Sequence, residues 1–304
     1  MHTLFVIRSR VQRVMLLSIA AALATMALKF GAWMLTGSVG LYSDAMESLV
    51  NLSAALLGFM LLGLAALPAD DDHPFGHEKA EYFASGAEGM LILFAAAAIA
   101  WEAVKGFMDP PPLQAMSLGL LLSLAATLVN AGAAWWLMKV AREEGSLAVE
   151  ADAQHLLTDV WTSVGVLAAL GLLLLFPTAW WLDPVIALAV ALNIVRTGVM
   201  LMMHSVNGLM DLQLPPAEFS AIEQALRAAL PAQTELNGLR TRKAGNRRFV
   251  EFNLLVPGAW TVHEGHVLCD VLEATVRGVF AETDILIHVE PAEDFKAEHP
   301  EQCA

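Results

Sequence analysis

The sequence predicts an α-helical membrane protein with six transmembrane helices, followed by a small C-terminal α/β domain in the cytoplasm. Only 16% of its 304 residues are charged and 57% are hydrophobic, whereas soluble domains carry about 25% charged residues. Six hydrophobic runs are each long enough to cross a bilayer, which takes about 20 residues. From about residue 212 the composition becomes that of a soluble domain. We therefore expect a membrane domain over residues 1–211 and a cytoplasmic domain over residues 212–304.

The hydrophobic runs give the approximate spans of the transmembrane helices. Arg8, Arg10 and Arg13 precede the first run and mimic a secretory signal, but the apolar stretch is too long and no convincing cleavage site follows. Short outer turns rich in Gly and Pro predict that consecutive helices are antiparallel neighbours. The six runs are Val14–Leu35, Leu41–Leu67, Tyr82–Met108, Leu113–Val140, Leu147–Phe176 and Trp180–Met203.

Basic residues in short loops predict the orientation, because they collect on the cytoplasmic side of a membrane. With the amino terminus inside, the outer side receives little beyond Lys105. Both termini are therefore expected in the cytoplasm, with the chain in a bacterial inner (plasma) membrane. The basic residues then assigned to the inner side are Arg8, Arg10, Arg13, Lys79, Lys139 and Arg142.

The C-terminal domain has the predicted element order α-β-β-α-β, which is typical of helices packed on a sheet. Two prolines mark the start of the first helix, and a turn signal at Lys243–Asn246 separates the first two strands. The expected helices are Pro215–Leu230 and Val262–Phe280, and the expected strands are Leu236–Arg242, Phe249–Val256 and Ile285–Val289.

The composition and charge exclude several classes of protein. A chain this hydrophobic is neither disordered nor an ordinary soluble enzyme. Its net charge of −14 argues against nucleic acid as a partner and favours cations. Two cysteines, Cys269 and Cys303, cannot make a disulfide framework and fit a reducing compartment.

Ionisable side chains inside the second and fifth runs indicate a functional site, because such groups are costly in hydrocarbon. Both runs share the pattern Asp-Ala-x-X-x-Leu-x-X, in which X is a polar residue able to bind metal. Spacings of three and four place the polar residues on one face of each helix. These residues are Asp44, Glu47 and Asn51 in the second run, and Asp152, His155 and Asp159 in the fifth.

Two i,i+4 pairs predict a metal site, Glu47 with Asn51 and His155 with Asp159. Together they supply three oxygen donors and one imidazole nitrogen, a number that suits a tetrahedral divalent transition metal. The alternative is a polar seam of interhelical hydrogen bonds, which two matching pairs with two carboxylates disfavour. The role of Asp44, like that of the equivalent aspartate in the fifth run, stays open between capping, guiding cations and holding the ligand helices.

A short inner loop carries a second group of candidate ligands. Asp70, His73 and His77 lie within one turn of sequence and can hold a metal at the membrane surface. The alternative is a solvated acidic loop, which attracts cations in any case.

At these residues the sequence resembles the cation diffusion facilitator family, most closely its bacterial FieF/YiiP-type iron and zinc efflux branch. The resemblance covers nearly the whole chain. It rests on the paired motifs of the second and fifth runs and on three further segments, Asp70–Glu81, Leu239–Arg242 and Ile287–Pro291.

The resemblance implies a homodimer whose protomers each have six membrane helices and a ferredoxin-like cytoplasmic domain. It implies exchange of a cytoplasmic divalent metal for external protons. It assigns the transport site to Glu47, Asn51, His155 and Asp159, and the loop site to Asp70, His73 and His77. Lys79 and Asp211 match a pair that interlocks the protomers.

Departures from the branch concern metal ligands. Asn51 replaces a carboxylate, so the transport site lacks one negative charge. Asn237 and Asn253 stand where the branch has histidines, which leaves only His266, His288 and Glu290 near ligand positions in the cytoplasmic domain. We expect the cytoplasmic metal site of the branch to be depleted or absent.

The predicted function is proton-coupled efflux of a divalent transition metal, not an enzyme activity. The metal ion and protons are the expected substrates, and lipid surrounds the membrane domain. No separate cofactor is expected. One imidazole among oxygens suits Zn²⁺ first and Fe²⁺ second, with Cd²⁺, Co²⁺ and Mn²⁺ also compatible. The alternatives are an intramembrane metal-dependent hydrolase and a non-transporting, metal-responsive membrane partner.

Overall fold

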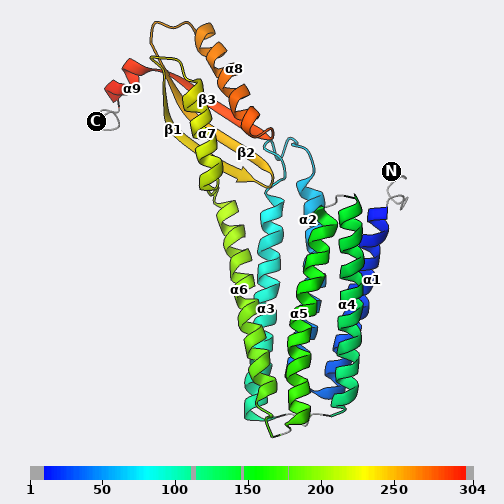
Figure 1. The fold of residues 1–304 in the computed structure, drawn as a ribbon. Helices are drawn as coiled ribbons and strands as arrows, with labels where there is room; N and C mark the ends of the chain where they lie inside the picture. The colour runs from blue at the N-terminus through cyan, green and yellow to red at the C-terminus, as the bar shows by residue number, and fades with distance from the viewer. Residues whose placement is uncertain (1–9, 111–113, 145–146, 177, 299–304) are drawn as a thin grey trace. The chain divides into compact units, whose positions relative to one another are not determined.

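The computed structural model describes residues 10–110, 114–144, 147–176 and 178–298, and among them six long helices precede the C-terminal domain (Figure 1). Three residues named in the predictions, Arg8, Leu113 and Cys303, lie outside these residues, as does Pro177 in the turn after the fifth run. The six helices confirm the predicted runs with ends shifted by a few residues. They are α1 Arg10–Thr36, α2 Val39–Ala65, α3 Ala80–Met108, α4 Met116–Glu144, α5 Leu147–Leu175 and α6 Leu182–Leu209.

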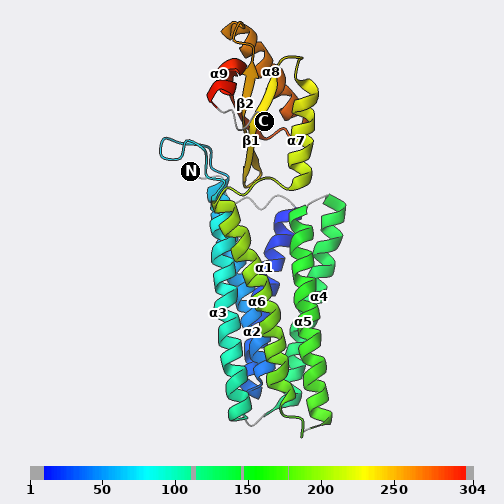
Figure 2. The same cartoon turned by 90° about the vertical axis from the view of Figure 1, so that its left-hand side faces the viewer.

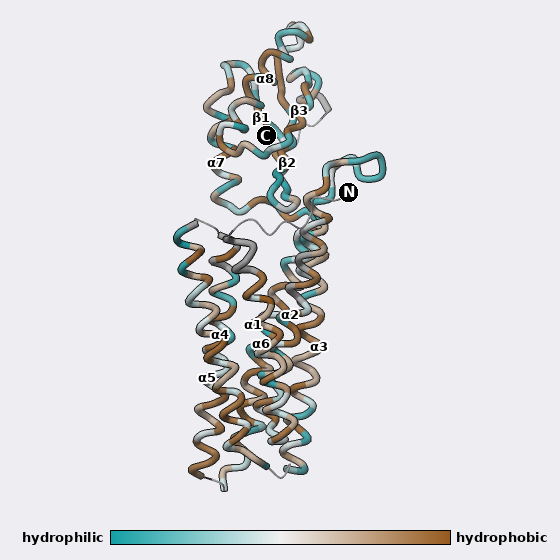
Figure 3. Tube along the Cα trace, turned by 90° about the vertical axis from the view of Figure 1, so that its right-hand side faces the viewer, coloured by the Kyte–Doolittle hydropathy of each residue, from teal (hydrophilic) through white to brown (hydrophobic). Residues whose placement is uncertain are grey.

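The helices carry the apolar surface of a membrane protein. Hydrophobic residues run along their length in Figure 3, and large apolar side chains such as Trp161 and Leu192 are each 73% exposed. Such exposure is costly in water and neutral in lipid. Among the described residues, five segments, in α1, α3, α4, α5 and α6, are apolar and long enough to cross a membrane. The paired motifs lie in the α5 segment, Asp152–Leu175, and in α2, which is 27 residues long.

Contacts between Cα atoms divide the chain into two compact units, Met1–Phe59 with Ala87–Met202, and Met60–Gly86 with Met203–Ala304. In the first unit, the six helices run side by side (Figures 1 and 2), and buried apolar side chains form two sets of helix contacts. One set joins α1, α4 and α5, with α2 packed on α1 and α5 through Leu41. The other set joins α2, α3 and α6. Helix α2 therefore belongs to both groups.

A buried aspartate from α6 caps the amino terminus of α2. Asp183 accepts hydrogen bonds from the backbone N–H groups of Val39 (2.8 Å) and Gly40 (3.0 Å) and from the Ser38 hydroxyl (2.6 Å). The first N–H groups of a helix have no intrahelical partner, and an unpaired buried N–H costs about 1–3 kcal/mol. A single side chain thus stabilises the start of α2 and joins it to α6.

Glycines allow α3 and α6 to approach closely. A Cβ atom on Gly89 would lie 3.0 Å from the Gly198 carbonyl oxygen, and one on Gly198 would lie 2.9 Å from side-chain atoms of Ile92. Small residues at such crossings are typical of helix pairs in membranes.

The C-terminal domain confirms the predicted order α-β-β-α-β and adds a short final helix, α9, that the sequence did not predict. Strands β1 and β2 are antiparallel and β2 and β3 parallel, in the order β1-β2-β3. Leu226 of α7 and Leu272 of α8 are fully buried in one core with the sheet. The elements are α7 Pro216–Ala229, β1 Glu235–Ala244, β2 Arg247–Val256, α8 Val262–Val279, β3 Thr283–Pro291 and α9 Ala292–Glu298.

The predicted turn between the first two strands is a two-residue hairpin. Gly245 has a φ of 55°, a left-handed conformation that glycine adopts at little cost. Strand β1 therefore ends at Ala244 and β2 begins at Arg247, so the turn is shorter than the sequence predicted.

Candidate metal centre

Three carboxylates, two buried and one half-buried, meet between α2 and α5. Asp44 and Glu47 lie one turn apart on α2, and Asp159 lies on α5; their candidate ligand oxygens are all within 4.8 Å of one another. Asp44 is 1% exposed and Asp159 is 5% exposed. Three carboxylates held this close in an apolar bundle are costly when ionised, and a cation or bound protons offset their charge.

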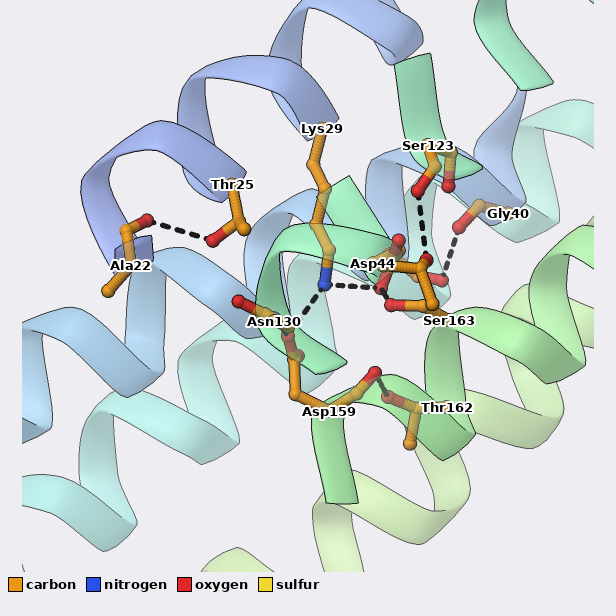
Figure 4. Close-up of polar contacts among 12 residues, drawn as sticks. Ala22, Thr25, Lys29, Gly40, Asp44, Ser123, Asn130, Asp159, Thr162 and Ser163 are labelled. Carbon is orange, nitrogen blue, oxygen red and sulfur yellow. Dashed lines mark hydrogen bonds and ion pairs between the residues drawn. The ribbon is translucent and has the colours of Figure 1, made fainter. Parts of the chain in front are cut away.

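A lysine ammonium supplies positive charge at this site (Figure 4). Lys29 of α1 is fully buried, and its Nζ lies 2.9 Å from Asp44 Oδ1 and 3.0 Å from Asp159 Oδ2. Lys29 was not predicted from the sequence, although a lone charge within the run Val14–Leu35 is a signal of the same kind as the acidic motifs.

Two further polar side chains hold the carboxylates in place. The Ser163 hydroxyl donates to Asp44 Oδ1 at 2.8 Å, and the Asn130 amide of α4 donates to Asp159 Oδ2. Six buried side-chain oxygens have no hydrogen-bond partner among the described residues, and four of them lie at this site: Asp44 Oδ2, Glu47 Oε2, Asp159 Oδ1 and Asn130 Oδ1. Unpaired buried oxygens are rare in folded proteins, and a cation site explains them.

The structure brings together two of the four predicted transport-site residues, Glu47 and Asp159. Asn51 is half-buried, and His155 is exposed and does not belong to the carboxylate cluster. The predicted shell of four therefore stays a prediction for this site.

The inner loop holds its three predicted ligands together. The ligand atoms of Asp70, His73 and His77 lie within 4.8 Å of one another. Asp70 lies 3.3 Å from His73 Nδ1 and 3.4 Å from His77 Nε2, and the Pro68 carbonyl lies 3.2 Å from His77 Nδ1. A carbonyl at one ring nitrogen leaves the other nitrogen free to bind metal.

Backbone geometry keeps Asp70 ionised. The backbone N–H of His73 donates to its carboxylate at 2.7 Å. This hydrogen bond, helped by the His73 side chain and by both imidazoles, holds the pKa of Asp70 below its ordinary value. A deprotonated carboxylate is the form that binds a metal ion.

The predicted interlock pair forms an ion pair within one chain. Lys79 Nζ lies 2.9 Å from Asp211 Oδ1, and Arg242 approaches the same oxygen at 3.4 Å. Partial burial alone would raise the pKa of Asp211, but the two cations hold it below its ordinary value.

The cytoplasmic candidates do not form a cluster: His266 lies on α8, whereas His288 and Glu290 lie on β3. Strand register places Asn237 opposite Asn253, and Asn253 opposite His288. His266 and His288 are exposed and Glu290 is half-buried. Within the described part of the chain, these three do not join a group of metal-capable side chains.

Comparison with known proteins gives matches over nearly the whole chain. The model "Cation efflux transmembrane domain" matches residues 15–210, and "Cation efflux protein, cytoplasmic domain" matches residues 214–292. The Uncharacterized transporter sll1263 of Synechocystis sp. is 48% identical over 94% of this chain and 92% of its own length. The Cation-efflux pump FieF of Klebsiella pneumoniae is 30% identical, covering 93% of both chains.

A solved structure gives a shorter match. A structure of CzrB, a candidate zinc transporter, is 42% identical and covers 26% of this chain and 96% of that chain, with a TM-score of 0.25.

Proposed function

The chain belongs to the cation efflux family of divalent cation transporters. We propose that it exports a divalent transition metal in exchange for protons, with Zn²⁺ as the first candidate and Fe²⁺ as the second. The observation that carries this proposal is the buried cluster of Asp44, Glu47 and Asp159 between two membrane helices. Ionisable groups at such depth face an ion pathway in transporters.

The proposed transport site comprises Glu47, Asn51, His155 and Asp159. Asn51 and His155 each lie one helical turn from a cluster carboxylate, on the same helix face. We place them in the ligand shell of a loaded state in which α2 and α5 have shifted relative to each other. Helix rearrangement around a central site is the general device of secondary transporters.

Proton coupling follows from competition at the ligands. A carboxylate or imidazole must lose its proton before it binds a metal, so metal binding releases protons and protonation expels metal. An imidazole is such a ligand, and His155 supplies it in the proposed site. Protons arriving from outside would therefore release the ion, and deprotonation toward the cytoplasm would restore the site.

The donor set supports a borderline divalent metal. Carboxylate and amide oxygens with one imidazole suit Zn²⁺ and Fe²⁺, and Cd²⁺, Co²⁺ and Mn²⁺ remain compatible, whereas a copper(I) site would call for thiolate or thioether ligands. The neutral amide of Asn51 binds a divalent cation less strongly than a carboxylate does.

Reconstituted vesicles test this function. With the vesicle lumen more acidic than the medium, we expect external zinc to accumulate inside, and to do so more slowly when the pH gradient is collapsed. The assay runs metal by metal with empty liposomes as the control. A hydrolase or a non-transporting partner would give no accumulation for any metal, which would refute the proposal.

The remaining assignments complete the proposed molecule. We place residues 1–211 in the inner membrane of a bacterium and residues 212–304 in the cytoplasm, with both termini cytoplasmic. We propose a homodimer in which Lys79 and Asp211 help to fix the protomers at the membrane surface. His266, His288 and Glu290 are at most a weak metal site.

For the loop, we expect His77→Ala to weaken zinc binding by at least about tenfold, because the site loses one of three ligands. Zinc binding to the full-length protein in detergent, measured in a variant with Asp159→Asn, isolates the loop from the transport site. Asp72→Ala is the control, since Asp72 lies in the same loop outside the cluster. Equal affinities for both variants would contradict a metal site here.

A further inference from the structure

We propose that Lys29 is a built-in competitor of the transported ion. Its ammonium occupies Asp44 and Asp159 while the site holds no metal, and it withdraws onto Asp44 when a divalent ion takes Asp159. This inference rests on the proposed transport function. It adds Lys29, as a permanent cation, and Asp44, as the carboxylate that keeps it, to the proposed transport site.

The contacts of Lys29 show a cation shared between two acids. Its Nζ lies almost equally far from Asp44 Oδ1 and Asp159 Oδ2, at 2.9 and 3.0 Å, and the side chain is fully buried. A buried ammonium needs a partner at every stage of a transport cycle, because an unpaired buried charge is strongly destabilising. Two acids allow the ammonium to leave one while keeping the other.

Asp44 is built to keep the ammonium. The Ser163 hydroxyl donates to the same Asp44 oxygen that Lys29 contacts, which fixes that oxygen in place. Asp44 also lies one turn before Glu47, so it is near the proposed ligands without being one of the four. This assigns a role that the sequence left open.

Unpaired oxygens mark where the ion would enter. Glu47 Oε2 and Asp159 Oδ1 have no hydrogen-bond partner among the described residues although both are buried. Each can bind metal, while the Asp159 oxygen now contacting Lys29 would lose that contact because a divalent ion repels the ammonium.

Charge balance supports the exchange. A divalent ion and Lys29 together carry three positive charges, and Asp44, Glu47 and Asp159 carry three negative ones when ionised. The loaded site is then neutral in the apolar interior, where net charge is costly. A carboxylate in place of the neutral Asn51 would add a fourth negative charge, so the amide at this position fits the balance.

Zinc titration of purified full-length protein in detergent at fixed pH tests the proposal. The background carries His73→Ala and His77→Ala so that the loop does not contribute. We expect Lys29→Met, which removes the competing charge, to lower the Kd for zinc by at least about tenfold and to slow zinc release. Lys105→Met removes a charge from a half-exposed residue paired with Glu102, and it should leave the Kd unchanged.

A double variant covers the case in which Lys29→Met fails to fold. Lys29→Met with Asp44→Asn deletes the ion pair as a unit and leaves Glu47 and Asp159 for the metal. We expect this variant to bind zinc more tightly than the unmodified site. Unchanged or weaker binding in the folded double variant would overturn the role of Lys29, whereas failure of the unmodified protein to move any metal would instead refute the proposed function.

Discussion

Asp159→Asn is expected to reduce metal transport by at least about a hundredfold, because Asp159 is a proposed metal ligand that contacts the ammonium with one oxygen and keeps the other unpaired. Its Oδ2 contacts Lys29 and Asn130, and its Oδ1 has no partner among the described residues. Asparagine keeps the shape of the side chain but removes the charge that a divalent ion needs. Initial zinc uptake by proteoliposomes, normalised to the amount of folded protein, measures the effect.

The same substitution two turns earlier on α5 is the matched control. Asp152 is half-buried and lies outside the carboxylate cluster, so Asp152→Asn should change uptake by less than about threefold. Uptake that survives Asp159→Asn would remove the cluster from the transport pathway. Growth of an efflux-deficient cell on high zinc gives the same comparison in vivo, and rescue by Asp159→Asn would favour a non-transporting partner.

His155→Ala is expected to remove most of the response to the pH gradient. His155 is exposed in this structure, one turn from Asp159, and an imidazole nitrogen that binds metal cannot hold a proton at the same time. We expect gradient-driven zinc uptake to fall about tenfold, toward the rate seen without a gradient. The measurement is uptake as a function of luminal pH, because more protons in the lumen should speed release only if a ligand can accept them.

His204→Ala is the control for this experiment. His204 lies on α6 with its ring against Tyr82, 5.7 Å between centroids, and has no place in the proposed site. It should leave the pH response intact. A pH response of normal size in His155→Ala would show that the carboxylates alone carry the protons.

The helices and the order of the C-terminal domain could be predicted because their signals are local. Long apolar runs, breakers between them and a glycine turn at Gly245 each determine structure within a few residues. The final helix α9, Ala292–Glu298, was not predicted because it has only seven residues and its sequence shows little apolar periodicity.

The site could be predicted only in part because its members come from four helices. Glu47 and Asp159 were found from spacing within a helix, which a sequence displays directly. Lys29 and Asn130 meet Asp159 only after α1, α4 and α5 have packed. Spacing also could not choose between Asn51 and Asp44 as neighbours of Glu47, since offsets of four and three share one face.

The bond network of Asp183 has a mechanical consequence for transport. Because this side chain holds the first N–H groups of α2 from the start of α6, those two helix ends cannot separate without exposing unpaired backbone groups. Any tilting of α2 against α6 must then pivot near Val39, so that displacement grows toward the carboxyl ends of both helices. The carboxyl ends of α2 and α6 can therefore move apart while their amino ends stay joined through Asp183.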